Sequence, residues 1–182
     1  TNKGQLKTHS ELEIQQTSNE EEFLSFHLDA IIISNPTSMH VVSALTFLRK
    51  GYKVFVEKPL GEQLEDCLKL ENFQSDFVVG YCFRFSPLFK ELKQRIDTLG
   101  RLYKCSFYRS YYLPLWHPYA DYTKEYMGNK QLGGGAVRTL SHEIDLMHKW
   151  FGTPEKTDSI VDRLSDLDID TEDFAWISCK YA

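Results

Sequence analysis

The stretch Lys53–Pro59, KVFVEKP, decides the fold class of this chain. Its apolar run Val54–Val56 is typical of a strand that is covered on both faces in a parallel sheet. The residues after the run, Glu57–Pro59, follow at the carboxyl end of that strand, the edge where open α/β sheets bind their ligands. A cation at this edge must stay solvated, pair with an anion or contact a substrate oxygen. Lys58 is therefore a candidate functional residue, and the alternative is a surface lysine at a strand end.

Strands and helices alternate on both sides of this stretch. The apolar run Ala30–Ile33 predicts a strand that ends before Pro36, because proline cannot donate to a ladder. A helix is expected next, capped by Ser38, with Val41, Leu45 and Leu48 on one face and Gly51 at its end. A helix through Leu64, Cys67 and Leu68, a strand Phe77–Val79 and a helix from Pro87 to Leu99 complete the pattern. The alternation predicts a doubly wound α/β domain with a parallel sheet.

The expected domain is only part of a dinucleotide-binding domain. Such a domain opens with a strand, a G-x-G-x-x-G turn and a helix. Nothing before Asp29 has that form, since Leu12–Gln16 is only a weak strand candidate and Ser18 precedes a short acidic helix start. We therefore expect a Rossmann-type sheet that lacks its first strands.

The sequence changes character near Arg101. Alternating apolar and polar residues predict a half-exposed strand over Leu102–Tyr112, and Leu113–Leu132 is expected to be a long loop. Two further strands are expected at Ser159–Leu164 and Phe174–Tyr181. These patterns predict two units: residues 1–100 as a partial dinucleotide-binding domain, and residues 101–182 as part of an α+β domain with an antiparallel sheet.

The segment Gly133–Gly152, GGGAVRTLSHEIDLMHKWFG, predicts a helix with two distinct faces. At about 100° per residue, one stripe is expected to be core and consists of Leu140, Ile144, Met147 and Phe151. His142 and Asp145 lie on the opposite side, where they can share a substrate hydroxyl or contact each other. The alternative is a solvated helix face with an ordinary histidine.

Composition excludes several function classes. The chain has 182 residues, 42% hydrophobic and 26% charged, with 21 basic and 26 acidic residues and a net charge of -5. Without a basic cluster, nucleic acid is not expected as a partner. No apolar run reaches the roughly 18 residues that span a bilayer, and four scattered cysteines without a CxxC pair fit a reducing cytoplasm. No metal site is expected, because HEIDL lacks the second histidine of HExxH and Thr171 replaces the glycine of a calcium loop.

Four segments in order resemble the Gfo/Idh/MocA family of NAD(P)-dependent oxidoreductases. They are Ser34-Asn35-Pro36-Thr37 with His40, GYKVFVEKP, VGYCFRFSP (Val79–Pro87) and GGGAVRTLSHEIDLMHKWFG. The resemblance implies a dinucleotide-binding domain joined to an α+β domain whose sheet carries substrate and oligomer contacts. It also implies NAD or NADP as cofactor, and a small sugar or cyclitol whose hydroxyl is oxidised or whose ketone is reduced. The aromatic loop and Arg138 favour a nucleotide-linked or acidic sugar as this substrate.

The same resemblance implies roles for individual residues. Lys58 and His142 would be catalytic: Lys58 would point at the reacting oxygen and His142 would be the general acid/base. Cofactor contacts would come from Asn35, Pro36, His40, Glu57, Pro59 and Arg84. Substrate contacts would come from Asp145, from Arg138 toward an anionic group, and from Trp116 and His117, for which simple packing of an aromatic loop is an equal alternative.

Two departures from the family pattern favour a second hypothesis. Arg138 stands where many relatives carry an Asp that completes the catalytic set, and an arginine cannot take a proton. The glycine turn that holds the pyrophosphate is also absent from this sequence. We therefore expect the 182-residue chain alone to be inactive, to require no cofactor and to bind dinucleotide weakly or not at all. The alternative is a redox-dead relative that acts as a binding or assembly module.

Overall fold

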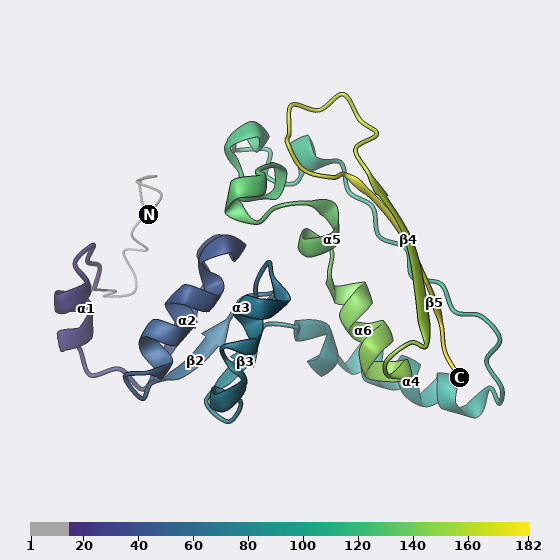
Figure 1. Ribbon diagram of the computed structural model, residues 1–182, viewed down its shortest axis with the longest axis horizontal. Coiled ribbons are helices and arrows are strands. Elements are labelled where there is room, and N and C mark those ends of the chain that lie inside the picture. The colour runs from purple at the N-terminus through teal and green to yellow at the C-terminus, as the bar shows by residue number, and fades with distance from the viewer. Residues whose placement is uncertain (1–14) are drawn as a thin grey trace.

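The computed structural model describes residues 15–182, and the strand candidate Leu12–Gln16 lies largely outside them. A three-stranded parallel sheet is followed by a two-stranded antiparallel sheet (Figure 1). The helices are α1 (Glu20–Ser25), α2 (His40–Leu48), α3 (Leu64–Leu68), α4 (Pro87–Thr98), α5 (Ala136–Thr139) and α6 (His142–Phe151). The strands are β1 (Ala30–Ile33), β2 (Lys53–Val56), β3 (Phe77–Val79), β4 (Lys156–Asp162) and β5 (Phe174–Lys180). Short 3-10 turns are η1 (Thr37–Met39), η2 (Glu71–Phe73), η3 (Cys82–Phe85), η4 (Leu113–Leu115), η5 (Tyr122–Lys124), η6 (Tyr126–Gly128) and η7 (Lys130–Leu132).

The parallel sheet has the order β1-β2-β3, as the alternation of strands and helices predicts. Ile33 lies beside Val56, and Val56 lies beside Val79, so the three strands end at a common edge. The predicted fold class, a partial Rossmann-type sheet followed by part of an α+β unit, is confirmed. Gly51, in the turn between α2 and β2, has a φ of 85°. Ser38 does not cap α2, because the turn η1 leads directly into the helix and no side-chain capping bond forms.

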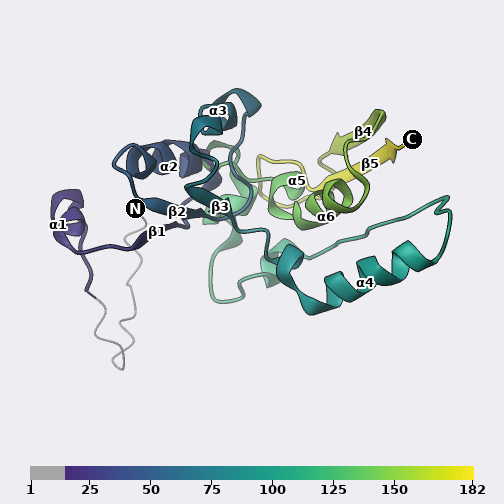
Figure 2. The ribbon, with the colours of Figure 1, turned by 90° about the horizontal axis from the view of Figure 1, so that it is seen from below.

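The core lies on one face of this sheet. Ile31, Ile33, Val54 and Val56 are buried beneath α2 and Leu70. On the opposite face Ile32 is 73% exposed and Val78 is 48% exposed. Figure 2 shows α2 and α3 on the same side of the strands. The expectation that β2 is covered on both faces holds only in part for the described residues: Phe55 on the second face is partly buried, and α4 packs along η3 instead of returning to the sheet.

The second half contains the antiparallel pair β4 and β5, in which Ile160 lies opposite Trp176. The two strands predicted there are confirmed, although β4 begins three residues earlier than Ser159. The strand predicted at Leu102–Tyr112 is wrong. This stretch finds no ladder partner within residues 15–182, and Tyr103 and Tyr108 are both almost fully exposed. The domain boundary near Arg101 stays a prediction.

Helix α6 does not turn its predicted core stripe inward. Ile144, Met147 and Phe151 are only partly buried, whereas Asp145 and Leu146 are buried. The reason is that the polar side of the helix packs against η3. There Arg84 donates hydrogen bonds to Asp145, and the Phe83 ring stacks on His142. Within residues 15–182 we find no helix whose length and apolar content would let it cross a bilayer.

Candidate active site

The carboxyl ends of β1 and β2 are joined by a buried histidine. His40, at the first turn of α2, is 2% exposed. Its Nδ1 lies 2.7 Å from the carbonyl oxygen of Pro59 and its Nε2 lies 2.8 Å from that of Asn35. His40 thus ties the loop that carries Lys58 to the loop that follows β1.

Lys58 reaches from the edge of the parallel sheet to the second half of the chain. Its Nζ donates a hydrogen bond to the carbonyl oxygen of Thr139 at 2.6 Å. Burial lowers the pKa of the Lys58 ammonium, the Arg109 guanidinium lowers it further, and Glu57 and Glu143 act in the opposite direction. A partly desolvated ammonium held by one carbonyl keeps donors free for a substrate oxygen.

Lys58 and His142 line the same cavity, which has a volume of about 170 Å³. Its walls are formed by Lys58, Phe83, Arg109, Trp116, Thr139, Leu140, His142 and Glu143. These residues come from the edge of the parallel sheet, from η3, from the extended stretch 102–112 and from the start of α6. Segments that are 84 positions apart in sequence therefore meet at one site. Within residues 15–182, no three His, Cys, Asp or Glu side chains gather as metal ligands do.

The His142 ring is held by aromatic contacts. It stacks on Phe83 with ring centroids 4.3 Å apart and meets the edge of Tyr81 at 6.0 Å. Burial lowers the pKa of His142, and the nearby positive charge of Lys58 lowers it further. Its Nδ1 is buried without a hydrogen-bond partner among the described residues. The ring is therefore held neutral near pH 7, with Nε2 as the nitrogen that remains to exchange a proton with a ligand.

Asp145 faces Arg84 rather than the cavity. The Arg84 Nε donates to both Asp145 carboxylate oxygens, at 3.0 and 2.8 Å, and a second guanidinium nitrogen contacts Oδ1. Asp145 is buried, and this bond raises the pKa of Arg84. The pair fastens η3 to α6, which fixes the platform formed by Phe83 beneath His142. The substrate role of Asp145 and the cofactor role of Arg84 stay predictions.

The side chains of the two loop residues Trp116 and His117 contact different parts of the structure. Trp116 lines the cavity and packs against Tyr111, with ring centroids 4.8 Å apart. His117 instead contacts Glu125 at 3.1 Å and stacks on Tyr119. Only Trp116 is placed to contact a molecule in the cavity.

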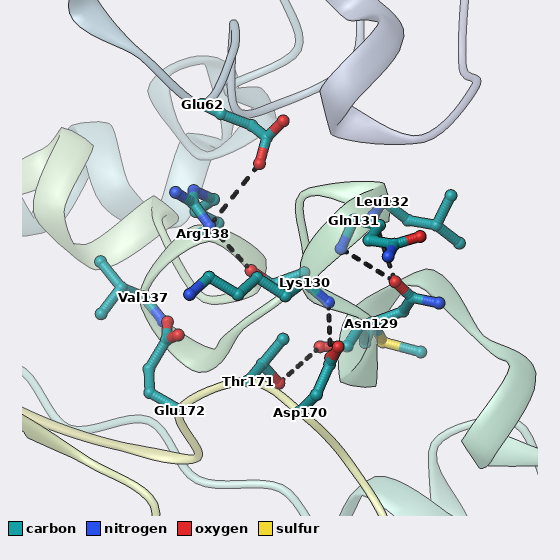
Figure 3. A network of polar contacts seen from close by, with 12 residues as sticks. Glu62, Asn129, Lys130, Gln131, Leu132, Val137, Arg138, Asp170, Thr171 and Glu172 are labelled. Atoms are coloured by element: carbon teal, nitrogen blue, oxygen red, sulfur yellow. Dashed lines mark hydrogen bonds and ion pairs between the residues drawn. The ribbon is translucent and has the colours of Figure 1, made fainter.

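Arg138 is not among the residues that line the cavity. Its NH1 donates to the carbonyl oxygen of Gly134 at 3.1 Å and lies 3.9 Å from a Glu62 carboxylate oxygen (Figure 3). Glu62 follows the EKP segment, so this ion pair joins the two halves of the chain beside the site. Figure 3 also shows Asp170, one member of the acidic run, accepting a hydrogen bond from the Lys130 backbone N–H at 2.6 Å.

Comparison with known proteins agrees with this architecture. Residues 2–74 match the family model described as an oxidoreductase family with an NAD-binding Rossmann fold, GFO_IDH_MocA. The chain is 32% identical over 129 residues to the scyllo-inositol 2-dehydrogenase (NAD(+)) of Bacillus subtilis, covering 69% of this chain and 36% of that protein. It is 28% identical over 137 residues to the rhizopine catabolism protein MocA of Rhizobium meliloti, covering 71% and 40%. The chain belongs to the Gfo/Idh/MocA family.

A solved structure shows the same fold. The WlbA dehydrogenase of Bordetella pertussis, in complex with NADH and UDP-GlcNAcA, superposes with a TM-score of 0.70 at 20% identity. That match covers 91% of this chain and 49% of the other. The chain thus spans 36–40% of these two curated relatives and about half of this solved structure.

Four more of the residues that were expected to contact the cofactor lie at the sheet edge of this family member. The Glu57 carboxylate accepts the Lys58 backbone N–H at 3.3 Å. Asn35 Nδ2 donates to Ser43 at 2.9 Å, whereas Asn35 Oδ1 is buried without a partner among the described residues. Pro36 and Pro59 belong to the two loops that His40 joins. Their cofactor roles stay predictions.

The sequence reasoning missed the two charged cavity residues Arg109 and Glu143, as well as the uncharged lining residues Phe83, Thr139 and Leu140. Arg109 NH1 lies 3.8 Å from Glu143 Oε1. The signal for Arg109 was present, because it occupies an odd position in the stretch 102–112 where the other odd positions are apolar or aromatic. Glu143 is the residue after His142, and its place on the helix gave no such signal.

Proposed function

We propose that the protein with this chain transfers a hydride between a nicotinamide cofactor, NAD or NADP, and a carbon of a sugar or cyclitol. The supporting observation is that Lys58 and His142 line one cavity at the carboxyl edge of the parallel sheet. The family match and the relatives named for inositol and sugar-nucleotide dehydrogenation support the same reaction class.

In this hydride transfer, His142 and Lys58 would have different roles. In the oxidation direction, neutral His142 removes the proton of the substrate hydroxyl. The Lys58 ammonium stabilises the negative charge that develops on that oxygen as the hydride leaves its carbon. In the reduction direction the same groups act in reverse: Lys58 polarises the ketone and protonated His142 returns the proton.

The edge of the sheet fits the cofactor proposed for this site. The buried Asn35 Oδ1 is an acceptor without a partner in the described chain, at the edge where open α/β sheets bind ligands. Asn35, Pro36, His40, Glu57 and Pro59 would hold the cofactor there, and the bound nicotinamide would supply the hydride chemistry.

Activity assays on the complete protein test this proposal. Reduction of NAD and of NADP is followed with a panel of sugars and cyclitols. Lys58→Met and His142→Gln are each expected to lower kcat by about a hundredfold or more. Lys69→Met, at the exposed position just after α3, and His27→Gln are the matched controls. Unchanged turnover in both site variants would refute the assignment.

The second candidate, a redox-dead binding module, is favoured by Arg138, which replaces the Asp of many relatives and pairs with Glu62. It predicts that the complete protein binds a sugar without any turnover, and that Lys58→Met changes affinity alone. The same assay therefore separates the two functions.

We also propose the cytoplasm as the compartment and a homo-oligomer formed through the β4-β5 sheet. All residues of β4 are exposed, including Ile160 at 58%. Sedimentation of the complete protein, compared with an Ile160→Lys variant, is expected to show an oligomer that the variant weakens.

A further inference from the structure

Arg109 is a second positively charged residue in the lining of the cavity, beside Lys58 and His142. Its guanidinium carries five N–H donors and is always charged. The nearest acid is Glu143, at 3.8 Å, which is a loose ion pair without a hydrogen bond. The side chain is 44% exposed. Its donors are thus available to a molecule in the cavity.

The charges that line the cavity leave an excess of one positive charge. Lys58 and Arg109 are cationic, Glu143 is anionic and His142 is held neutral. Asp145, the other acid of this helix turn, is already paired with Arg84 outside the lining. Glu57, behind Lys58, is bonded to the Lys58 backbone N–H and is not part of the lining. The lining therefore favours an anionic ligand, although the Glu57 charge, which raises the pKa of Lys58, offsets part of this excess.

Arg138 does not supply this recognition. The sequence made Arg138 the candidate for binding an anionic group, but its guanidinium is turned toward Gly134 and Glu62. Arg109 is the arginine that faces the cavity. Arg109, and not Arg138, is therefore the arginine placed to bind an anionic group in the cavity.

We propose that Arg109 is a specificity-determining residue that binds the carboxylate of an acidic polyhydroxy substrate, such as a uronic acid. This inference rests on the proposed function, since it assigns the substrate class of the same site. A planar guanidinium matches a carboxylate in bidentate geometry. A carboxylate carries one negative charge, whereas a phosphate monoester carries about 1.5 to 2 near neutral pH. Trp116 lines the same wall and offers an apolar face to a sugar ring.

Isothermal titration of the complete protein with D-glucuronate, D-glucose and D-glucose 6-phosphate tests the inference without requiring turnover. Glucuronate is expected to bind about tenfold or more tightly than the other two. Arg109→Gln is expected to remove this preference, because it lowers glucuronate affinity much more than glucose affinity. Arg109→Lys keeps the charge but loses the bidentate fork, so it should retain only part of the preference. The matched control is Arg95→Gln, an exposed arginine on α4.

The outcomes separate this inference from the proposed function. Equal affinities for the three probes, a preference for the phosphate, or a glucuronate preference that survives Arg109→Gln would overturn the role of Arg109. If neutral polyols are oxidised while Arg109→Gln has no effect, the proposed function stands and this inference fails. If no substrate is oxidised but the glucuronate preference depends on Arg109, the binding role stands and the redox function fails.

Discussion

Lys58 and His142 affect each other's protonation because they share one cavity. The pKa of His142 is lowered by burial and by Lys58, and the pKa of Lys58 is lowered chiefly by burial. Oxidation needs neutral His142, so activity should rise with pH through a value below the ordinary histidine pKa of about 6.5. It should fall again as Lys58 loses its proton, at a pH below its ordinary pKa of about 10.4.

Substitution of Lys58 should shift the acidic limb of this profile. Lys58→Met removes a positive charge that disfavours the imidazolium, so the pKa of His142 should rise toward its ordinary value. The kcat/KM profile of the residual activity, measured against pH, is expected to show this limb at higher pH than in the wild type. A limb that does not move would mean that the titrating group is not His142.

At the residue scale the sequence singled out Lys58 and His142, which line one cavity, but it did not predict the rest of the cavity lining. Lys58 and His142 stand out because each follows a recognisable strand or glycine segment. Arg109 was interpreted as part of a strand, and nothing in the sequence singled out Glu143. Arg109 and Glu143 line one cavity because residues 102–112 pass beside α6. The local sequence of either segment does not predict this packing.

At the scale of the secondary-structure elements, the first prediction concerns His40, which joins the loops that follow β1 and β2. His40→Ala leaves the carbonyl groups of Asn35 and Pro59 without their buried donor, which should cost about 1–3 kcal/mol of stability. The free energy of unfolding, measured with urea on the complete protein, checks this. The matched control His27→Ala changes an exposed histidine and is expected to stay within about 0.5 kcal/mol. Equal effects of the two variants would argue against the bridge.

The triple glycine before α5 gives the second prediction. A Cβ at Gly134 would lie 2.1 Å from the carbonyl oxygen of Tyr126 and 2.5 Å from that of Met127. Because these obstacles are backbone atoms, Gly134→Ala must displace the turn η6, and we expect a loss of about 2–3 kcal/mol. Gly100→Ala is the comparison, since its φ of 77° costs strain but no atom lies within 4 Å. Chemical unfolding of both variants should show the larger loss for Gly134→Ala.

The elements that the sequence predicted well are those set by local pattern. β1, β2, β3 and α2 follow from short apolar runs and a repeated helical face. The two failures need partners that are distant in sequence. Leu102–Tyr112 alternates like a strand but pairs with nothing in the described chain, and α6 turns its polar side inward because Arg84 and Phe83 receive Asp145 and His142.

At the scale of the whole molecule, the chain has the cavity lined by Lys58 and His142, but its sequence does not contain the phosphate-binding glycine turn of Rossmann folds. Dinucleotide affinity in Rossmann folds comes largely from a glycine turn and helix N-terminus that hold the pyrophosphate. This sequence has no G-x-G-x-x-G turn. What it keeps is the edge where β1 and β2 end, with the free acceptor Asn35 Oδ1.

The 182-residue chain by itself is therefore expected to bind NADH and NADPH weakly or not at all. The uncovered sheet face, with Ile32 at 73% exposure, should add a tendency to self-associate. Titration of both reduced cofactors, followed by their fluorescence and by light scattering, measures the two effects separately. Saturable binding in the micromolar range by a monodisperse chain would contradict this prediction, because it would mean that the β1-β2 edge holds a dinucleotide without a glycine turn.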